Sequence, residues 1–136
     1  MHTFIKRVTA PVILALSLLA AMALPGFAHA GGETISAGEF TGINNHTVVG
    51  AVSIVKTDSG YEIVMGEDFV FDGAPDPKVA LGKDGKYDPS TLIQLLKSDT
   101  GAQSYVVPDS IDVSLFNEVH IWCEKFNVGL AVAPLQ

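Results

Sequence analysis

The chain has 136 residues and carries 15 acidic against eight basic residues, a formal net charge of −7. This length suits one domain with a single core and little room for a second. Its few lysines are scattered, which argues against a nucleic-acid partner and against adhesion to an anionic membrane surface.

The first 30 residues have the three parts of a secretory signal peptide. Lys6 and Arg7 form a short positive region, residues 8–24 are uncharged and mostly apolar, and Ala28-His29-Ala30 places small residues at −3 and −1 of a cleavage site after Ala30. The alternative is a membrane anchor, although about 17 apolar residues are few for a bilayer of about 30 Å. We therefore expect an exported protein, periplasmic or secreted, without membrane contact after cleavage.

Cleavage at this site leaves a more acidic chain with one cysteine. Residues 31–136 retain all 15 acidic residues but only six lysines, a formal charge of −9 (6 − 15). Cys123 has no partner for an internal disulfide. An odd cysteine in an exported protein indicates a buried thiol, an intermolecular bridge or a reactive group.

After a short polar lead at residues 31–37, the chain at 38–136 has the pattern of a β domain. Short apolar runs with period two, bounded by turn residues, predict strands. These runs are Thr47–Lys56, Tyr61–Met65, Phe69–Phe71, Lys78–Gly82, Gln103–Val107, Val119–Cys123 and Val128–Val132. The turn at 57–60 joins the first two as a hairpin.

Two segments between these runs are less regular. Leu92–Lys97 fits one turn of helix as well as a strand, and Ile111–Asn117 predicts a turn or a short 3₁₀ piece. With about eight short strands and no long helix after residue 30, the sequence predicts an all-β fold, an antiparallel sandwich or a small barrel.

No local motif predicts an enzyme. The histidines after residue 30 are His46 and His120, and no nucleophile elbow accompanies them. His120 and Cys123 are three residues apart on a predicted strand, so their side chains point to opposite faces and cannot share one metal ion without a bulge. We expect no resident metal or cofactor and no enzymatic activity of the chain alone.

Acidic residues gather in two predicted loops. Asp72 and Asp76 lie in a Pro-rich loop at residues 72–77, and Asp84 lies in a polar loop at residues 83–89. The spacing of Asp68 with the first two is not that of an EF-hand, so we interpret these residues as turn formers. Loops on a β scaffold are common binding sites, and this pair is the candidate surface of a binding module.

The segment His120-Ile-Trp122-Cys123 holds the single tryptophan and the single cysteine. Alternation places Val119 and Cys123 on one face of the strand and His120 and Trp122 on the other. Cys123 is then either a small buried hydrophobe or a thiol kept for redox chemistry, and the spacing leaves both open.

Several segments resemble, in order and spacing, those of a DM13 domain. The specific ones are Gly101-Ala-Gln103-Ser-Tyr105-Val-Val-Pro108 and Ile121-Trp122-Cys123; Phe40-Thr-Gly42, Gly50–Ile54, Asp68-Phe69, Gly73–Leu81 and Phe126–Leu135 accompany them. The resemblance extends from about residue 38 to 135. It implies an all-β extracytoplasmic domain.

The resemblance also implies a role in electron transfer or another redox reaction, with Cys123 as the redox group and Trp122 and His120 as its neighbours. Some relatives adjoin DOMON domains, which hold haem or sugar, and this chain has no room for one. We therefore expect a separate protein partner in the envelope or extracellular space, DOMON-like or another redox protein, and any haem would belong to that partner. The alternative is a non-catalytic binding module with Cys123 in the core.

Overall fold

The computed structural model describes residues 31–136. The predicted signal peptide, with its cleavage residues Ala28 and Ala30, lies outside the described residues. Within 31–136, no helix has the length and apolarity that a membrane crossing requires.

The regular secondary structure of the described chain consists of strands and two short 3₁₀ turns. The strands are β1 (Glu33–Glu39), β2 (Thr41–Gly42), β3 (Val48–Val49), β4 (Ala51–Thr57), β5 (Gly60–Met65), β6 (Val70–Phe71), β7 (Pro77–Lys83), β8 (Lys86–Tyr87), β9 (Gln94–Leu95), β10 (Gln103–Val107), β11 (Glu118–Cys123) and β12 (Val128–Pro134). The turns are η1 (Pro89–Thr91) and η2 (Val113–Leu115).

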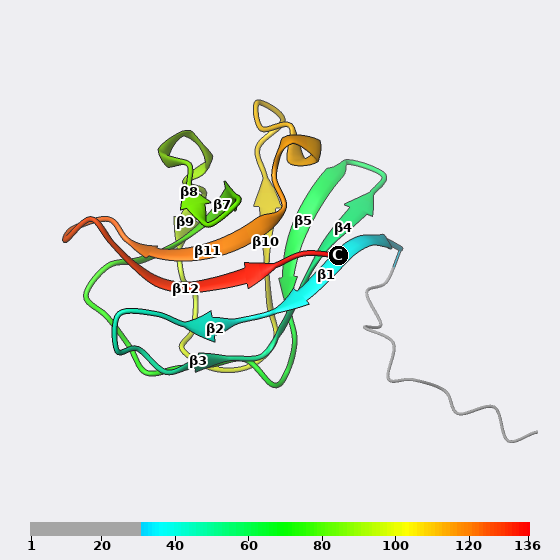
Figure 1. Ribbon diagram of the computed structural model, residues 1–136. Helices are drawn as coiled ribbons and strands as arrows, with labels where there is room; N and C mark the ends of the chain where they lie inside the picture. Colours follow the sequence, from blue (N-terminus) through cyan, green and yellow to red (C-terminus); the bar gives the residue numbers. More distant parts are fainter. Residues whose placement is uncertain (1–30) are drawn as a thin grey trace, which may run out of the picture.

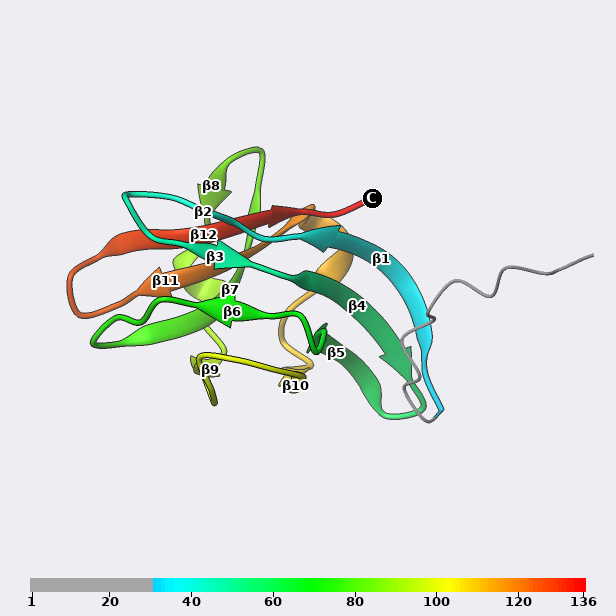
Figure 2. The same cartoon turned by 90° about the horizontal axis from the view of Figure 1, so that it is seen from below.

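Two open antiparallel sheets form a sandwich. The first has the strand order β1-β4-β5-β10, and the second has the order β2-β12-β11-β7-β8 with β9 also paired to β7. A small third sheet pairs β3 with β6. Figures 1 and 2 show that β11 and β12 run across the direction of β4, β5 and β10. The all-β prediction is confirmed, and of its two forms the sandwich is the one observed.

The core lies between the two sheets and is built by alternating side chains. Along β4 and β5, Val52, Ile54 and Ile63 point inward, and Val79, Leu81 and Ile121 meet them from β7 and β11. Phe69 and Tyr105 fill the remaining space with large buried rings. Because strands of both sheets contribute to one core, the sheets hold each other in place.

The predicted hairpin and several strand bounds are confirmed. Antiparallel pairs run from Val52 with Met65 to Thr57 with Gly60, which closes the turn. β10 begins and ends where the alternation predicted, and η2 lies inside the segment that was expected to be a turn or 3₁₀ piece.

Two segments differ from the sequence interpretation, and a third was left open by it. Residues 31–37, predicted as a polar lead, contain most of β1, which pairs with β4 along its length. The polar loop at 83–89 contains β8 and is therefore a hairpin with β7. Leu92–Lys97, which fitted a strand as well as one turn of helix, contains the short strand β9, so the strand alternative is confirmed. In each case a partner strand supplies backbone hydrogen bonds that the local pattern does not reveal.

Candidate functional site

Strand β11 separates two environments. Its residues Val119, Ile121 and Cys123 lie in the core cluster, as the alternation predicted. His120 and Trp122 occupy the opposite side of the strand. β11 pairs with β7 in regular register, whereas a bulge in its pairing with β12 falls between Ile121 and Trp122.

Cys123 is a free thiol inside the core. It is 1 % exposed and ends β11, where it pairs with Pro77 on β7 and with Val128 on β12. Thiol exchange requires a thiolate that another molecule can reach. In the closed fold, therefore, Cys123 packs as a small apolar residue, and exchange at this thiol requires local opening.

Trp122 lies against a tyrosine on the other side of the strand. The rings of Tyr87 and Trp122 are 4.2 Å apart between centroids and inclined by 13°, and both side chains are partly exposed. Tyr87 pairs with Gly82 of β7, so β7 lies between the two strands that carry the stacked rings. On the β12 side, a Cβ on Gly129 would lie 3.2 Å from the indole, so this glycine makes room for the ring.

His120 is the buried neighbour of this pair. It is 2 % exposed, its Nε2 lies 2.8 Å from the Glu118 carboxylate, and its Nδ1 has no hydrogen-bond partner. Glu118 also accepts the backbone N–H of Gly85 at 2.8 Å. The carboxylate therefore ties the imidazole to the turn of the β7–β8 hairpin, which carries Tyr87.

Charged groups border the aromatic pair. Lys78, opposite Trp122 in the register, pairs with Glu124 and lies 3.5 Å from the Asp76 carboxylate. The hydrogen bond to Glu124, followed by the charge of Asp76, raises the pKa of Lys78. We define the Trp122 face as Trp122, Tyr87, Lys78, Asp76 and Glu124.

The same charges act on the phenol of Tyr87. Partial burial raises its pKa first, and the carboxylates of Glu124 and Asp88 raise it further, while Lys78 opposes them. The electrostatic surroundings of the ring are therefore acidic, and they oppose the formation of further negative charge.

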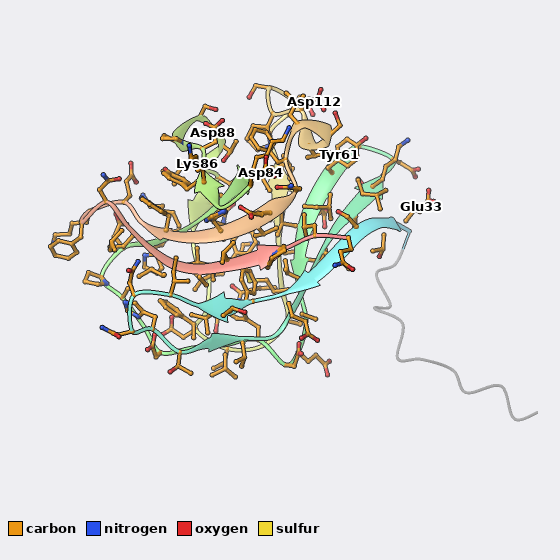
Figure 3. All side chains as sticks on the ribbon, viewed as in Figure 1. Glu33, Tyr61, Asp84, Lys86, Asp88 and Asp112 are labelled. Carbon is orange, nitrogen blue, oxygen red and sulfur yellow. The ribbon has the colours of Figure 1, made fainter. Side chains whose placement is uncertain are left out.

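The structure brings some predicted residues together and keeps others apart. Asp76 lies on the Trp122 face, where its carboxylate also accepts the Lys125 N–H at 3.1 Å. Asp84 lies at the tip of the β7–β8 hairpin with Lys86 and Asp88 (Figure 3), and its carboxylate accepts a hydrogen bond from Asn117. The Asp72 carboxylate instead lies within hydrogen-bond distance of His46 Nδ1 and accepts the Thr47 N–H.

Sequence reasoning missed Tyr87, Lys78 and Glu118. Tyr87 lay in a segment interpreted as a polar loop, and its contact with Trp122 depends on the order of three strands. Gly82 inside an apolar strand was a signal only for the close approach of another group, which in the structure is the His120 imidazole.

Comparison with family models matches residues 39–135 to the family described as Electron transfer DM13. The match spans more than half of the chain and includes all of β11 and the Trp122 face. The chain belongs to the DM13 family. Comparisons with curated proteins and with solved structures gave no match.

The DM13 domain offers no ready-made metal centre within residues 31–136. No group of three or more His, Cys, Asp or Glu side chains there is arranged to hold a metal ion. His120 and Cys123 lie on opposite sides of β11. Asp68, whose spacing with Asp72 and Asp76 was compared with that of a calcium-binding loop, accepts a hydrogen bond from the Ala51 N–H. The family description indicates an electron-transfer-related role.

Proposed function

We propose that this DM13 protein is exported and works as a non-enzymatic module of an electron-transfer system, docking a redox protein on its Trp122 face. The observation that carries this proposal is that both predicted binding loops adjoin Trp122. Asp76 comes from the loop at 72–77, and Tyr87 from the segment at 83–89 stacks on the indole. Loop residues held on a rigid sheet are well placed to contact a partner.

The charges favour a basic partner. Asp76 and Glu124 outnumber Lys78 on the face, and the chain as a whole has a formal charge of −7. Complementary charge speeds encounter and fixes orientation more than it adds affinity. The partner supplies the redox cofactor, for example haem, because this chain is proposed to hold none.

Site-specific cross-linking in the source cells tests the docking face. A photo-cross-linking amino acid at Glu124, which is exposed beside Trp122, should capture a basic protein that carries a redox cofactor. The same group at Val106, which is 67 % exposed on β10 of the other sheet, is the control and should not. Equal capture from both positions, or capture of proteins without a redox group, would contradict the proposal.

Export is tested on the same cells. The protein should be recovered outside the cytoplasm with Gly31 as its first residue, as read by mass spectrometry of the N-terminal peptide. Recovery from the cytoplasm with Met1 retained would refute this part of the proposal.

A second candidate function is supported by the position of Cys123 at the end of a strand. It precedes the turn at 124–127, and strand ends open at lower free-energy cost than strand centres. On opening, the Cys123 thiolate would attack a partner's disulfide, forming a mixed disulfide and releasing the partner's second sulfur as a thiolate. Electrons and atoms balance without a further reactant.

The reaction of Cys123 with a thiol reagent separates the two candidates. If Cys123 is the redox group, the native protein should react measurably faster than global unfolding allows. Reaction only at the rate of global unfolding would leave Cys123 as a core residue and favour docking alone. In that case Cys123→Ser should lower the free energy of unfolding more than Cys123→Ala does, because a buried hydroxyl without a partner costs about 1–3 kcal/mol.

A further inference from the structure

The Tyr87–Trp122 stack is a direct contact between two oxidisable side chains. Their centroids are 4.2 Å apart and their planes nearly parallel, so the two π systems touch without intervening atoms. Both rings are partly exposed, and Trp122 Nε1 donates a hydrogen bond to Asn127 Oδ1 at 3.3 Å. An electron can therefore pass between solvent-facing indole and phenol without a bridging group.

The other tyrosines are placed differently. Tyr105 is 1 % exposed in the core, and its hydroxyl is bonded to Gln103 and Lys97. Tyr61 lies on β5 of the other sheet and packs against the core. Within residues 31–136, Tyr87 is the tyrosine in ring contact with the single tryptophan of the chain.

The surroundings favour a positive charge on the pair. Glu124 and Asp88 act electrostatically on Tyr87, and one cation, Lys78, opposes them. Nearby carboxylates stabilise a radical cation for the same reason that they stabilise any cation. The acidic rim that favours a basic partner thus also favours loss of an electron from the rings beneath it.

From this geometry we infer that the stacked Tyr87–Trp122 pair is the relay through which single electrons leave the domain toward a docked partner. The inference rests on the proposed docking face. A high-potential one-electron oxidant in the partner takes an electron from the Trp122 indole. Tyr87 returns one electron to the indole and releases its phenolic proton to solvent, leaving a neutral Tyr87 phenoxyl radical. A one-electron reductant and one proton then restore the phenol.

Flash photolysis with a cationic ruthenium(III) tris-bipyridine oxidant tests this relay in the purified protein. Transient absorption should show the Trp122 radical decaying at the rate at which a tyrosyl radical appears. In Tyr87→Phe, which keeps a stacking ring, the indole radical should live at least tenfold longer and the tyrosyl signal should be lost. Tyr61→Phe is the matched control and should behave as the wild type.

An unchanged indole lifetime in Tyr87→Phe, or loss of the tyrosyl signal in Tyr61→Phe, would overturn the inference. A slower transfer in heavy water, measured on the wild type, supports the phenolic proton step without any variant, and identical rates would contradict it. Failure of the relay leaves the cross-linking result intact, whereas failure of docking leaves the radical kinetics intact. The two proposals therefore fail separately.

Discussion

Two glycines determine how the ring side chains of β11 lie. A Cβ on Gly82 would lie 2.4 Å from His120 Nε2 and 2.5 Å from the Lys86 carbonyl oxygen, and one on Gly129 would lie 2.7 Å from Ile43. The absence of side chains at these positions lets the imidazole and the indole lie close to neighbouring strands. The geometry of the site therefore depends on two residues that take no part in its chemistry.

Gly82→Ala should destabilise the fold and disturb the site together. The added methyl group meets the Lys86 backbone, which the β7–β8 ladder holds in place, so overpacking should lower the free energy of unfolding by roughly 1–3 kcal/mol. Urea unfolding measures this change. Val106→Ala, on an exposed edge, serves as the control and should change stability by at most about 0.5 kcal/mol. Equal stability of the two variants would show that β8 moves freely.

The Asp72 carboxylate makes the free energy of unfolding depend on pH in the acidic range. The Thr47 N–H, then His46, lower its pKa below the unfolded value of 3.8. Because the folded pKa is the lower one, this contribution is present above pH 3.8 and is lost as the pH falls through the folded value. Asp72→Asn should therefore flatten the loss of stability below pH 3.8, as measured by urea unfolding over a pH series.

The control for this change is Asp58→Asn, which removes the same charge from the exposed turn between β4 and β5. Its pH profile should follow that of the wild type. Identical profiles for Asp72→Asn and the wild type would mean that the contacts of Asp72 with Thr47 and His46 do not persist in solution.

At the scale of elements, a buried carboxylate ties the turn of the β7–β8 hairpin to β11, in addition to the pairing of β7 with β11 and the hydrogen bonds between Asp84 and Asn117. Glu118 accepts the Gly85 N–H with one oxygen and contacts His120 with the other. This hairpin carries Tyr87 onto Trp122, so its closure decides whether the aromatic pair exists. The hairpin has a two-residue strand, β8, and needs this tertiary tie because so short a strand contributes little pairing.

Glu118→Gln should loosen the hairpin selectively. Hydrogen bonds to a charged group contribute about 1.5–3 kcal/mol, so the Gly85 amide should exchange with solvent roughly 10- to 100-fold faster. Hydrogen exchange followed by NMR measures this rate, and the Val79 amide in the middle of β7 is the internal control. Equal acceleration of both amides would indicate global destabilisation and not a local tie.

At the scale of the whole molecule, one core joins both sheets. Val52 and Ile63 of the first sheet lie in the same buried cluster as Val79 and Ile121 of the second. Neither sheet has a second apolar layer of its own, so we expect the two to unfold together.

Unfolding in urea should follow one transition by two probes. Fluorescence of Trp122 reports on the β11 sheet, and far-ultraviolet circular dichroism reports on all strands. The two curves should share one midpoint. Separate midpoints would show that one sheet retains structure after the other has opened.

The sequence by itself determined which face each residue of β11 takes. Side chains alternate along any strand, so Cys123 shares the core side with Ile121, whatever the neighbouring strands are. The same alternation predicted the bounds of β10 and the all-β class. It did not predict β1, whose small and polar residues are mostly exposed and carry a weak periodic signal.

Only the tertiary structure decided what lies on the other face. Tyr87 stacks on Trp122 across β7, because β8 joins β7 on the side away from β11. Strand order depends on pairing between segments far apart in the chain, which local periodicity cannot encode. Likewise, Cys123 is 1 % exposed because its side of β11 packs into the core cluster to which both sheets contribute, and that packing involves strands far from it in the sequence.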